Sequence, residues 1–194
     1  MKKLFFLPLF LVLAACQTNS MDGLETVDAS EAAELETSLD SGKALVFGDV
    51  YYEDNRCGGS SFVMINEETK ETWGITNGSV KILMQKDTAP VKPGTYRITN
   101  VRCGQSSVAI GGSWTDALLG KDKLKKLFAP RFTVEAGEVL HVGTLRINII
   151  KKKTWLDDAR VIVTREATTP EAKQRTEAAL ANLDRPIQFT TSGD

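Results

Sequence analysis

The stretch FTVEAGEVLHVGTLRINI, residues 132 to 149, decides the fold class of this 194-residue chain. Apolar residues at positions 145, 147 and 149 alternate with polar residues at positions 144, 146 and 148, which is the pattern of a strand with one buried face. The segment Ala136-Gly137-Glu138 interrupts the apolar residues and supplies a turn. We therefore expect strands on both sides of that turn.

Similar short segments recur along the chain. A turn at Pro93-Gly94 opens an alternating strand that reaches position 101, and Asn77-Gly78 is a strong hairpin signal. Further β-prone runs cover residues 44–52, 61–66, 71–75, 80–84 and 159–165. Repeated short strands with turns between them predict a mainly β domain, an antiparallel β-sandwich.

Three segments depart from this pattern towards helix. Ser30 precedes good helix formers and predicts a short helix to about Leu39, and residues 116 to 128 predict a short insertion helix. Thr169-Pro170 starts a C-terminal helix that we expect to stop near residues 184 to 186. Its apolar stripe comprises Ala172, Thr176, Ala179, Leu180 and Leu183. Residues 187 to 194 are expected to be a flexible tail.

The N-terminus has the features of an export signal. Lys2 and Lys3 precede a short apolar run, which ends in Leu13-Ala14-Ala15-Cys16. This tetrad resembles the lipobox of bacterial lipoproteins. The resemblance implies that residues 1 to 15 are a signal peptide, that cleavage occurs before Cys16, and that Cys16 carries the lipid. An uncleaved N-terminal helix is the alternative.

The lipidated cysteine would make the membrane a partner of this chain through acyl chains, an effectively permanent attachment. Gln17 follows Cys16. In the enterobacterial family Asp at that position favours the inner membrane, so the resemblance implies the periplasmic face of the outer membrane, with the inner membrane as the alternative. We expect residues 16 to 42 to form a tether with a short helix, and residues 43 to 186 to form the sandwich with its C-terminal helix.

Composition excludes several classes of function. Removal of the signal leaves 22 basic and 25 acidic residues, a formal net charge of −3. That balance, together with export, argues against nucleic acid as a partner. No later apolar run is long enough to cross a membrane as a helix.

Two cysteines remain once Cys16 is assigned to the lipid. An even pair in an exported chain most simply forms a disulfide, here between Cys57 and Cys103. The alternative makes one of them a nucleophile acting with His141, the only histidine of the chain.

Candidates for chemistry are few. A lone histidine without a second ligand at metal-binding spacing predicts a structural role for His141, so we expect no metal and no cofactor. The acidic pairs Glu53-Asp54 and Glu67-Glu68 read as solvated turns, because neighbouring strand residues point to opposite faces. The nucleophile-elbow pattern is absent. The sequence therefore predicts no enzyme.

Two basic runs lie near tryptophans: residues 121–126 near Trp114, and Lys151, Lys152 and Lys153 near Trp155. The second run is a candidate contact with a membrane or polyanion, because basic and aromatic side chains suit an anionic surface. The alternative is a solvated hairpin tip.

The strand after Pro93-Gly94 and the stretch from Phe132 to Leu145 together resemble small bacterial lipoproteins of transthyretin-like or carboxypeptidase-regulatory-like sandwich type. The resemblance covers about residues 43 to 165, supports the sandwich and implies no catalytic residue. We expect a non-enzymatic binding or envelope-assembly module with an envelope protein as a possible partner. The alternatives are a carrier of a small lipid or sugar ligand, and a hydrolase of envelope glycan or peptide that uses carboxylates or His141.

Overall fold

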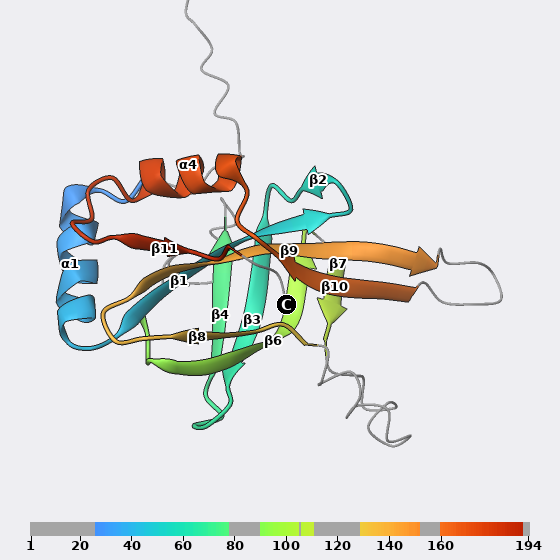
Figure 1. The fold of residues 1–194 in the computed structure, drawn as a ribbon, viewed down its shortest axis with the longest axis horizontal. Coiled ribbons are helices and arrows are strands. Elements are labelled where there is room, and N and C mark those ends of the chain that lie inside the picture. Colours follow the sequence, from blue (N-terminus) through green and yellow to red (C-terminus); the bar gives the residue numbers. More distant parts are fainter. Residues whose placement is uncertain (1–25, 78–89, 105, 111–128, 152–159, 192–194) are drawn as a thin grey trace, which may run out of the picture.

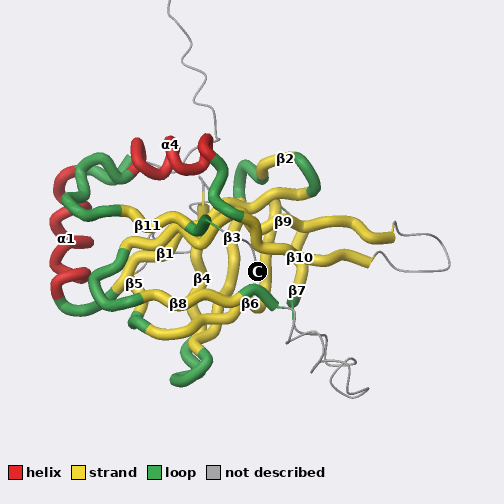
Figure 2. Tube along the Cα trace, in the orientation of Figure 1, coloured by secondary structure: helices red, strands yellow, loops and turns green. Residues whose placement is uncertain are grey.

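The computed structural model describes residues 26–77, 90–104, 106–110, 129–151 and 160–191. Two β-sheets pack face to face, and two helices lie along the outer side of one of them (Figure 1). Figure 2 shows how strongly strands dominate the described part of the chain. The predicted β-sandwich is confirmed.

The larger sheet has six strands, with β10 (Arg160–Glu166), β9 (Val139–Lys151), β1 (Ala44–Tyr52) and β2 (Asn55–Arg56) in that spatial order. Two short strands complete it: β11 (Ile187–Phe189) pairs with β9, and β5 (Pro90–Val91) pairs with β1. The long strand β9 thus has β1 along one side, and β11 followed by β10 along the other.

The smaller sheet has five strands, in the order β4 (Thr72–Asn77), β3 (Ser60–Asn66), β6 (Gly94–Cys103) and β7 (Ser106–Ala109). The strand β8 (Arg131–Val134) also pairs with β6. All four pairings in this sheet are antiparallel. Tyr96 and Ile98 are buried as their alternation predicts, but a register shift then turns Val101 inward in place of Asn100.

Antiparallel pairing is not the rule throughout, since β9 runs parallel to both β1 and β11. The physical reason lies in β1, which is buried from Ala44 to Val50 instead of alternating. Strands that are covered on both faces read as continuous apolar runs, and such runs are typical of parallel pairing. No short turn links β1 to β9, so nothing local forces them to be antiparallel.

The main core lies between the two sheets. Its largest fully buried side chains include Phe62, Met64, Tyr96, Ile98 and Leu145. Tyr96 stacks on Phe132 with 5.7 Å between ring centroids, and its hydroxyl donates to the carbonyl of Lys92 at 2.7 Å. The alternation that predicted the inward face of β9 is confirmed, because Leu145 and Ile147 are completely buried.

The helix α1 (Ala29–Asp40) belongs to the folded domain and not to a tether, so the expected boundary at residue 43 is wrong. Asp28 caps the helix by accepting the N–H of Glu31 at 2.8 Å, in place of the Ser30 cap that the sequence suggested. A second core on the outer face of the larger sheet comprises Val27, Ala32, Leu35, Leu39, Leu45, Phe47, Val139, Leu180 and Leu183. Three apolar residues of α1, one turn apart, were enough to dock it.

The helix α4 (Pro170–Ala179) starts as predicted, with Thr169 accepting the N–H of Ala172. The predicted stripe from Ala172 to Leu183 is buried at all five positions, although the helix itself ends at Ala179. The expected flexible tail is wrong at Ile187–Phe189, which forms β11. Ile187 packs against the second core, and the three residues extend the sheet beside β9.

Other predictions fall outside the described residues. They are the hairpin at Asn77-Gly78, the strand at 80–84, the insertion helix at 116–128 and the last residues of the tail, 192–194.

Leu35→Ala tests whether α1 is part of the domain. Deleting a buried leucine side chain leaves a cavity, so we expect the free energy of unfolding to fall by about 2–4 kcal/mol in urea denaturation. Ala33→Ser on the exposed side of the same helix is the control and should change it by no more than about 0.5 kcal/mol. Equal small effects at both positions would contradict the docking of α1.

Candidate functional site

The outer face of the larger sheet is divided into a covered half and an open half (Figure 1). In the covered half, α1 and α4 lie over the second core. Beyond it the outward-facing side chains of β1, β9 and β10 are not overlain by any described helix. We call this set the open half; it comprises Tyr51, Arg146, Asn148, Ile150, Ile162, Thr164 and Glu166.

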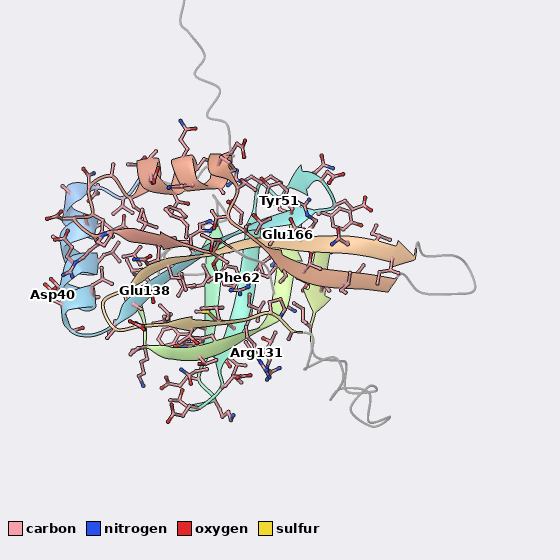
Figure 3. All side chains as sticks on the ribbon, viewed as in Figure 1. Asp40, Tyr51, Phe62, Arg131, Glu138 and Glu166 are labelled. Atoms are coloured by element: carbon pink, nitrogen blue, oxygen red, sulfur yellow. A yellow bond between two sulfur atoms is a disulfide. The ribbon has the colours of Figure 1, made fainter. Side chains whose placement is uncertain are left out.

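Arg146 is the centre of the open half. Its Nε and Nη2 donate to the two carboxylate oxygens of Glu166 at 2.8 and 3.0 Å, and its guanidinium carbon lies 5.2 Å from the ring centroid of Tyr51. The guanidinium also donates to the carbonyl of Glu53. The hydrogen bonds to Glu166 raise the pKa of Arg146 above its ordinary value, so it stays charged. Figure 3 labels Tyr51 on β1 and Glu166 on β10, the two strands on either side of β9.

This arrangement holds an aromatic ring and a guanidinium in a fixed geometry on a sheet face where the side chain of Arg146 is 20% exposed and that of Glu166 is 42% exposed. The bidentate ion pair restricts the arginine, and the arginine in turn sits over the ring. Tyrosine and arginine are enriched where proteins bind other proteins, because each offers a large contact area together with hydrogen-bonding groups. The open half is thus chemically suited to binding.

A buried charged cluster lies at the border between the two halves. Asp49 of β1 accepts from Arg56 of β2 at 3.1 Å and from Arg175 of α4 at 3.0 Å. Nε2 of His141 lies 3.6 Å from Oδ2, the same carboxylate oxygen that accepts from Arg175. Burial alone would raise the pKa of Asp49, but His141, Arg175 and Arg56 outweigh that effect and lower the pKa to about 2.

Both ring nitrogens of His141 have neighbours: Nε2 faces Asp49, and Nδ1 contacts Gly143 and Thr168. The N–H of Gly143 donates to its Nδ1 at 3.2 Å, and the hydroxyl of Thr168 lies 3.1 Å from the same nitrogen. An accepting Nδ1 assigns the ring proton to Nε2, which faces Asp49. Gly143 has φ of +96° and its missing Cβ would lie 2.2 Å from the carbonyl oxygen of Glu166, so only glycine fits there.

Thr168, His141 and Asp49 have the residue types of a catalytic triad, but not its properties. The side chain of His141 is only 2% exposed, and Gly143 already occupies the nitrogen that a nucleophile would use. Asp49 is neutralised by two arginines. The contacts join β1, β2, β9 and α4, which is a structural role.

Cys57 and Cys103 are joined by a disulfide, with 5.3 Å between their Cα atoms. Cys57 follows β2 of the larger sheet and Cys103 ends β6 of the smaller one, so the bond links the two sheets. A bridge across a sequence separation of 46 stabilises the fold by about 4 kcal/mol in the chain-entropy view.

The other predicted site residues are separated from these features or lie outside the described part. Lys151 ends β9, whereas Cys16, Lys152, Lys153 and Trp155 fall outside the described residues. Glu67 pairs with Arg97 at 3.3 Å and with Arg131 at 3.1 Å, so the charged groups placed beside it are arginines. Within the described ranges no three His, Cys, Asp or Glu residues are grouped so as to hold a metal ion.

Sequence reasoning identified His141 but missed Asp49, Arg56 and Arg175. The available signal was Asp49 itself, a carboxylate directly after the apolar run that begins at Ala44. A charge inside a buried strand needs partners, although the sequence could not name them.

Comparison of the chain with protein-family models, with curated proteins and with solved structures finds no match. Among the described residues, neither helix has the length and apolar character needed to span a membrane.

The cluster predicts a pH dependence of stability. The pKa of Asp49 is lower in the folded state, about 2 against 3.8, so its contribution is present above pH 4 and is lost as the pH falls towards 2. Asp49→Asn removes this contribution. We expect the gap in unfolding free energy between the wild type and the variant to shrink by about 2 kcal/mol from about pH 5 to pH 2. A gap that stays constant in acid denaturation experiments would contradict the ionised cluster.

Proposed function

We propose that this chain is a lipid-anchored, non-enzymatic binding module of the bacterial envelope. On this proposal the chain is held at the periplasmic face of the outer membrane and binds an envelope component through the open half of its larger sheet. The observation that carries the proposal is the division of that sheet. Asp49 and His141 contact each other, and Asp49 also binds Arg175 of α4, so these two groups take part in the docking of that helix. Tyr51 and Arg146 contact each other on the half of the sheet that no described helix covers.

The attachment rests on the tetrad Leu13-Ala14-Ala15-Cys16 and on the cysteine count. Cys57 and Cys103 bind each other, so the third cysteine of the sequence, Cys16, is not part of that pair. A disulfide between two sheets also suits an oxidising compartment such as the periplasm. These features support export followed by lipidation of Cys16.

The start of the folded domain fits such an attachment. The N–H of Val27 donates to the carbonyl of Ala179 at 2.9 Å, so the chain enters the domain beside the end of α4. Ten positions separate Cys16 from Thr26, a reach of at most about 35 Å. The adjacent helix α1 carries acidic residues and no basic one: Glu31, Glu34, Glu36 and Asp40. An acidic surface is repelled by anionic lipid, so we assign the attachment to the acyl chains alone.

Binding is favoured over the two alternatives by what fills the candidate sites. A hydrolase would need His141 to reach a substrate, but its side chain is buried under α4 and β11. A carrier would need space between the sheets, where Phe62, Met64 and Tyr96 of the smaller sheet are fully buried in the main core. A ligand there would have to displace well-packed side chains.

Lipidation is tested by growing cells with a clickable palmitate analogue. We expect label on the wild-type chain and none on Cys16→Ser, because serine cannot form the thioether. The double variant Cys57→Ser/Cys103→Ser is the matched control and should keep its label. An unlabelled wild type, or label that persists on Cys16→Ser, would refute the lipid anchor.

Binding through the open half is tested by photo-crosslinking in intact cells. A benzoylphenylalanine at Tyr51 keeps an aromatic ring over Arg146, and the same probe at exposed Gln174 on α4 is the control. We expect a discrete product with one envelope component from position 51 only, identified by mass spectrometry. A product that holds only two copies of this chain, or equal labelling from both positions, would contradict the proposal.

A further inference from the structure

The strands of the smaller sheet carry only positive charge. Within their described bounds, β3, β4, β6, β7 and β8 contain three arginines and neither aspartate nor glutamate. All three arginines point away from the core, because each adjoins a buried residue of its own strand. We call the outward side of β6, β7 and β8 the arginine face; it comprises Thr95, Arg97, Arg102, Ser107, Arg131 and Thr133.

Two of these arginines stand directly opposite each other. Arg97 and Arg131 are Cα partners in the pairing of β6 with β8. Like charges in opposite positions destabilise a sheet. The compensation is one carboxylate oxygen: Oε1 of Glu67, in the turn after β3, lies 3.3 Å from Nε of Arg97 and 3.1 Å from Nε of Arg131. A single carboxylate between two guanidiniums leaves one positive charge uncompensated.

Arg102 adds a further charge along β6. Its Nε donates to the carbonyl of Gly104 at 2.7 Å, its side chain is exposed, and no ion pair joins it to a carboxylate of the described residues. At about 3.3 Å per residue, it lies about 15 Å along the strand from Arg97. Three arginines less one carboxylate leave a net charge of 3 − 1 = +2 on the arginine face together with Glu67.

Hydroxyl groups lie beside the arginines. Thr95 and Thr133 form another opposite pair of β6 and β8, both are exposed, and their hydroxyl oxygens lie 3.0 Å apart. Ser107 of β7 is exposed opposite Arg102. The large hydrophobic side chains that are exposed in the described part of the chain belong to β9 and β10 of the other sheet. The arginine face therefore offers charge and hydrogen bonds without an apolar anchor.

We propose that the arginine face binds an extended glycan that carries carboxylate groups. Guanidinium groups bind carboxylates through charge-assisted hydrogen bonds, and Arg97 and Arg131 are already arranged around one. The threonine and serine hydroxyls both donate and accept, which suits the hydroxyl groups of a sugar. Charges about 15 Å apart require a polymer, because one small anion cannot contact both.

Two other classes of partner fit this face less well. The core of a protein interface is enriched in aromatic residues and depleted of charged ones, whereas the arginine face has the opposite composition. A surface that enters lipid carries aromatic or aliphatic side chains for the bilayer interface. Arg131 lies on the opposite side of the molecule from α4 (Figures 1 and 3), so this inference goes beyond the proposed function and does not rest on the open half.

Binding of the purified, detergent-solubilised full chain to polygalacturonate tests the proposal. This polymer carries a carboxylate on every sugar, and its full methyl ester has the same backbone without the charge. In a biosensor measurement we expect the chain to bind immobilised polygalacturonate but not the ester, and we expect binding to weaken as the ionic strength rises. Equal binding to the two polymers, or binding to neither, would overturn the proposal.

Arg102→Gln/Arg131→Gln removes two of the three positive charges. We expect this double variant to weaken binding to polygalacturonate by roughly tenfold, because two charge-assisted contacts are lost. Lys43→Gln/Lys173→Gln is the matched control, since it removes the same charge from exposed positions outside the smaller sheet. Its binding should be nearly unchanged. An equal loss in both double variants would show that only the net charge of the chain matters and would contradict a site on the arginine face.

Glu67→Gln tests the same site in the opposite direction. Glutamine keeps the size of the side chain but removes the carboxylate that competes for Arg97 and Arg131. We therefore expect binding to polygalacturonate to strengthen by roughly threefold. A gain cannot result from loss of structure, so this variant separates binding from folding. Unchanged or weaker binding by Glu67→Gln would count against the proposal.

Polyglutamate and inorganic polyphosphate distinguish the source of the negative charge. Tighter binding of polyglutamate than of polygalacturonate would replace the glycan by an acidic protein segment, and tighter binding of polyphosphate would replace it by a phosphate polymer. Either result would refute the assignment to a carboxylated glycan. The palmitate and photo-crosslinking experiments involve Cys16 and Tyr51 and not the arginine face, so failure here is distinguishable from failure of the proposed function.

Discussion

The structure depends on burial of the β1–β9 pair on both of its faces. The inner face packs on the smaller sheet, and the outer face needs its own cover because Leu45, Phe47 and Val139 point outward. Burying a large apolar side chain contributes about 1.5–3 kcal/mol, so leaving these three in water would be costly. The two helices and β11 cover these outward-facing side chains. The parallel pairing, the docking of α1 and the ordering of residues 187–189 all follow from the same requirement.

Asp49 lies at the border between the covered half and the open half of the larger sheet. It follows Phe47 and Gly48 on β1, opposite a register shift in β9. Gly48 has no room for a side chain, because a Cβ there would lie 2.9 Å from Val142. A carboxylate at this border must be neutralised, and Arg175 reaches it from α4. A buried ion pair contributes little stability compared with apolar packing, but removing one partner is expensive. The charge therefore restricts where α4 can lie more than it strengthens the fold.

Patterns in short stretches of sequence predicted the features that depend on neighbouring residues. The burial of Tyr96 and Ile98 in β6 and of Leu145 and Ile147 in β9, the Thr169-Pro170 helix start and its buried stripe are confirmed because each depends on residues close in sequence. The cover of the sheet was not predictable in the same way. Val27, Leu35 and Leu39 are too sparse to indicate a core until β1 brings Leu45 and Phe47 beneath them. The ion pairs of Asp49 join residues up to 126 positions apart. Spacing patterns in the sequence do not predict contacts between residues so far apart.

The larger sheet places the start of the folded domain and the open half at different ends of its outer face. The chain enters the domain at Val27, in the second core under which β9 begins, whereas Tyr51 and Arg146 lie further along β1 and β9, and Ile150 lies near the far end of β9. The 13 residues of β9 span roughly 40 Å, so the point where the chain enters the domain is far from the end of β9 at Lys151. The covered half shields the outer apolar side chains near the point of entry. Under the proposed N-terminal attachment, the open half is the part of this face that lies farther from the point where the chain enters the domain.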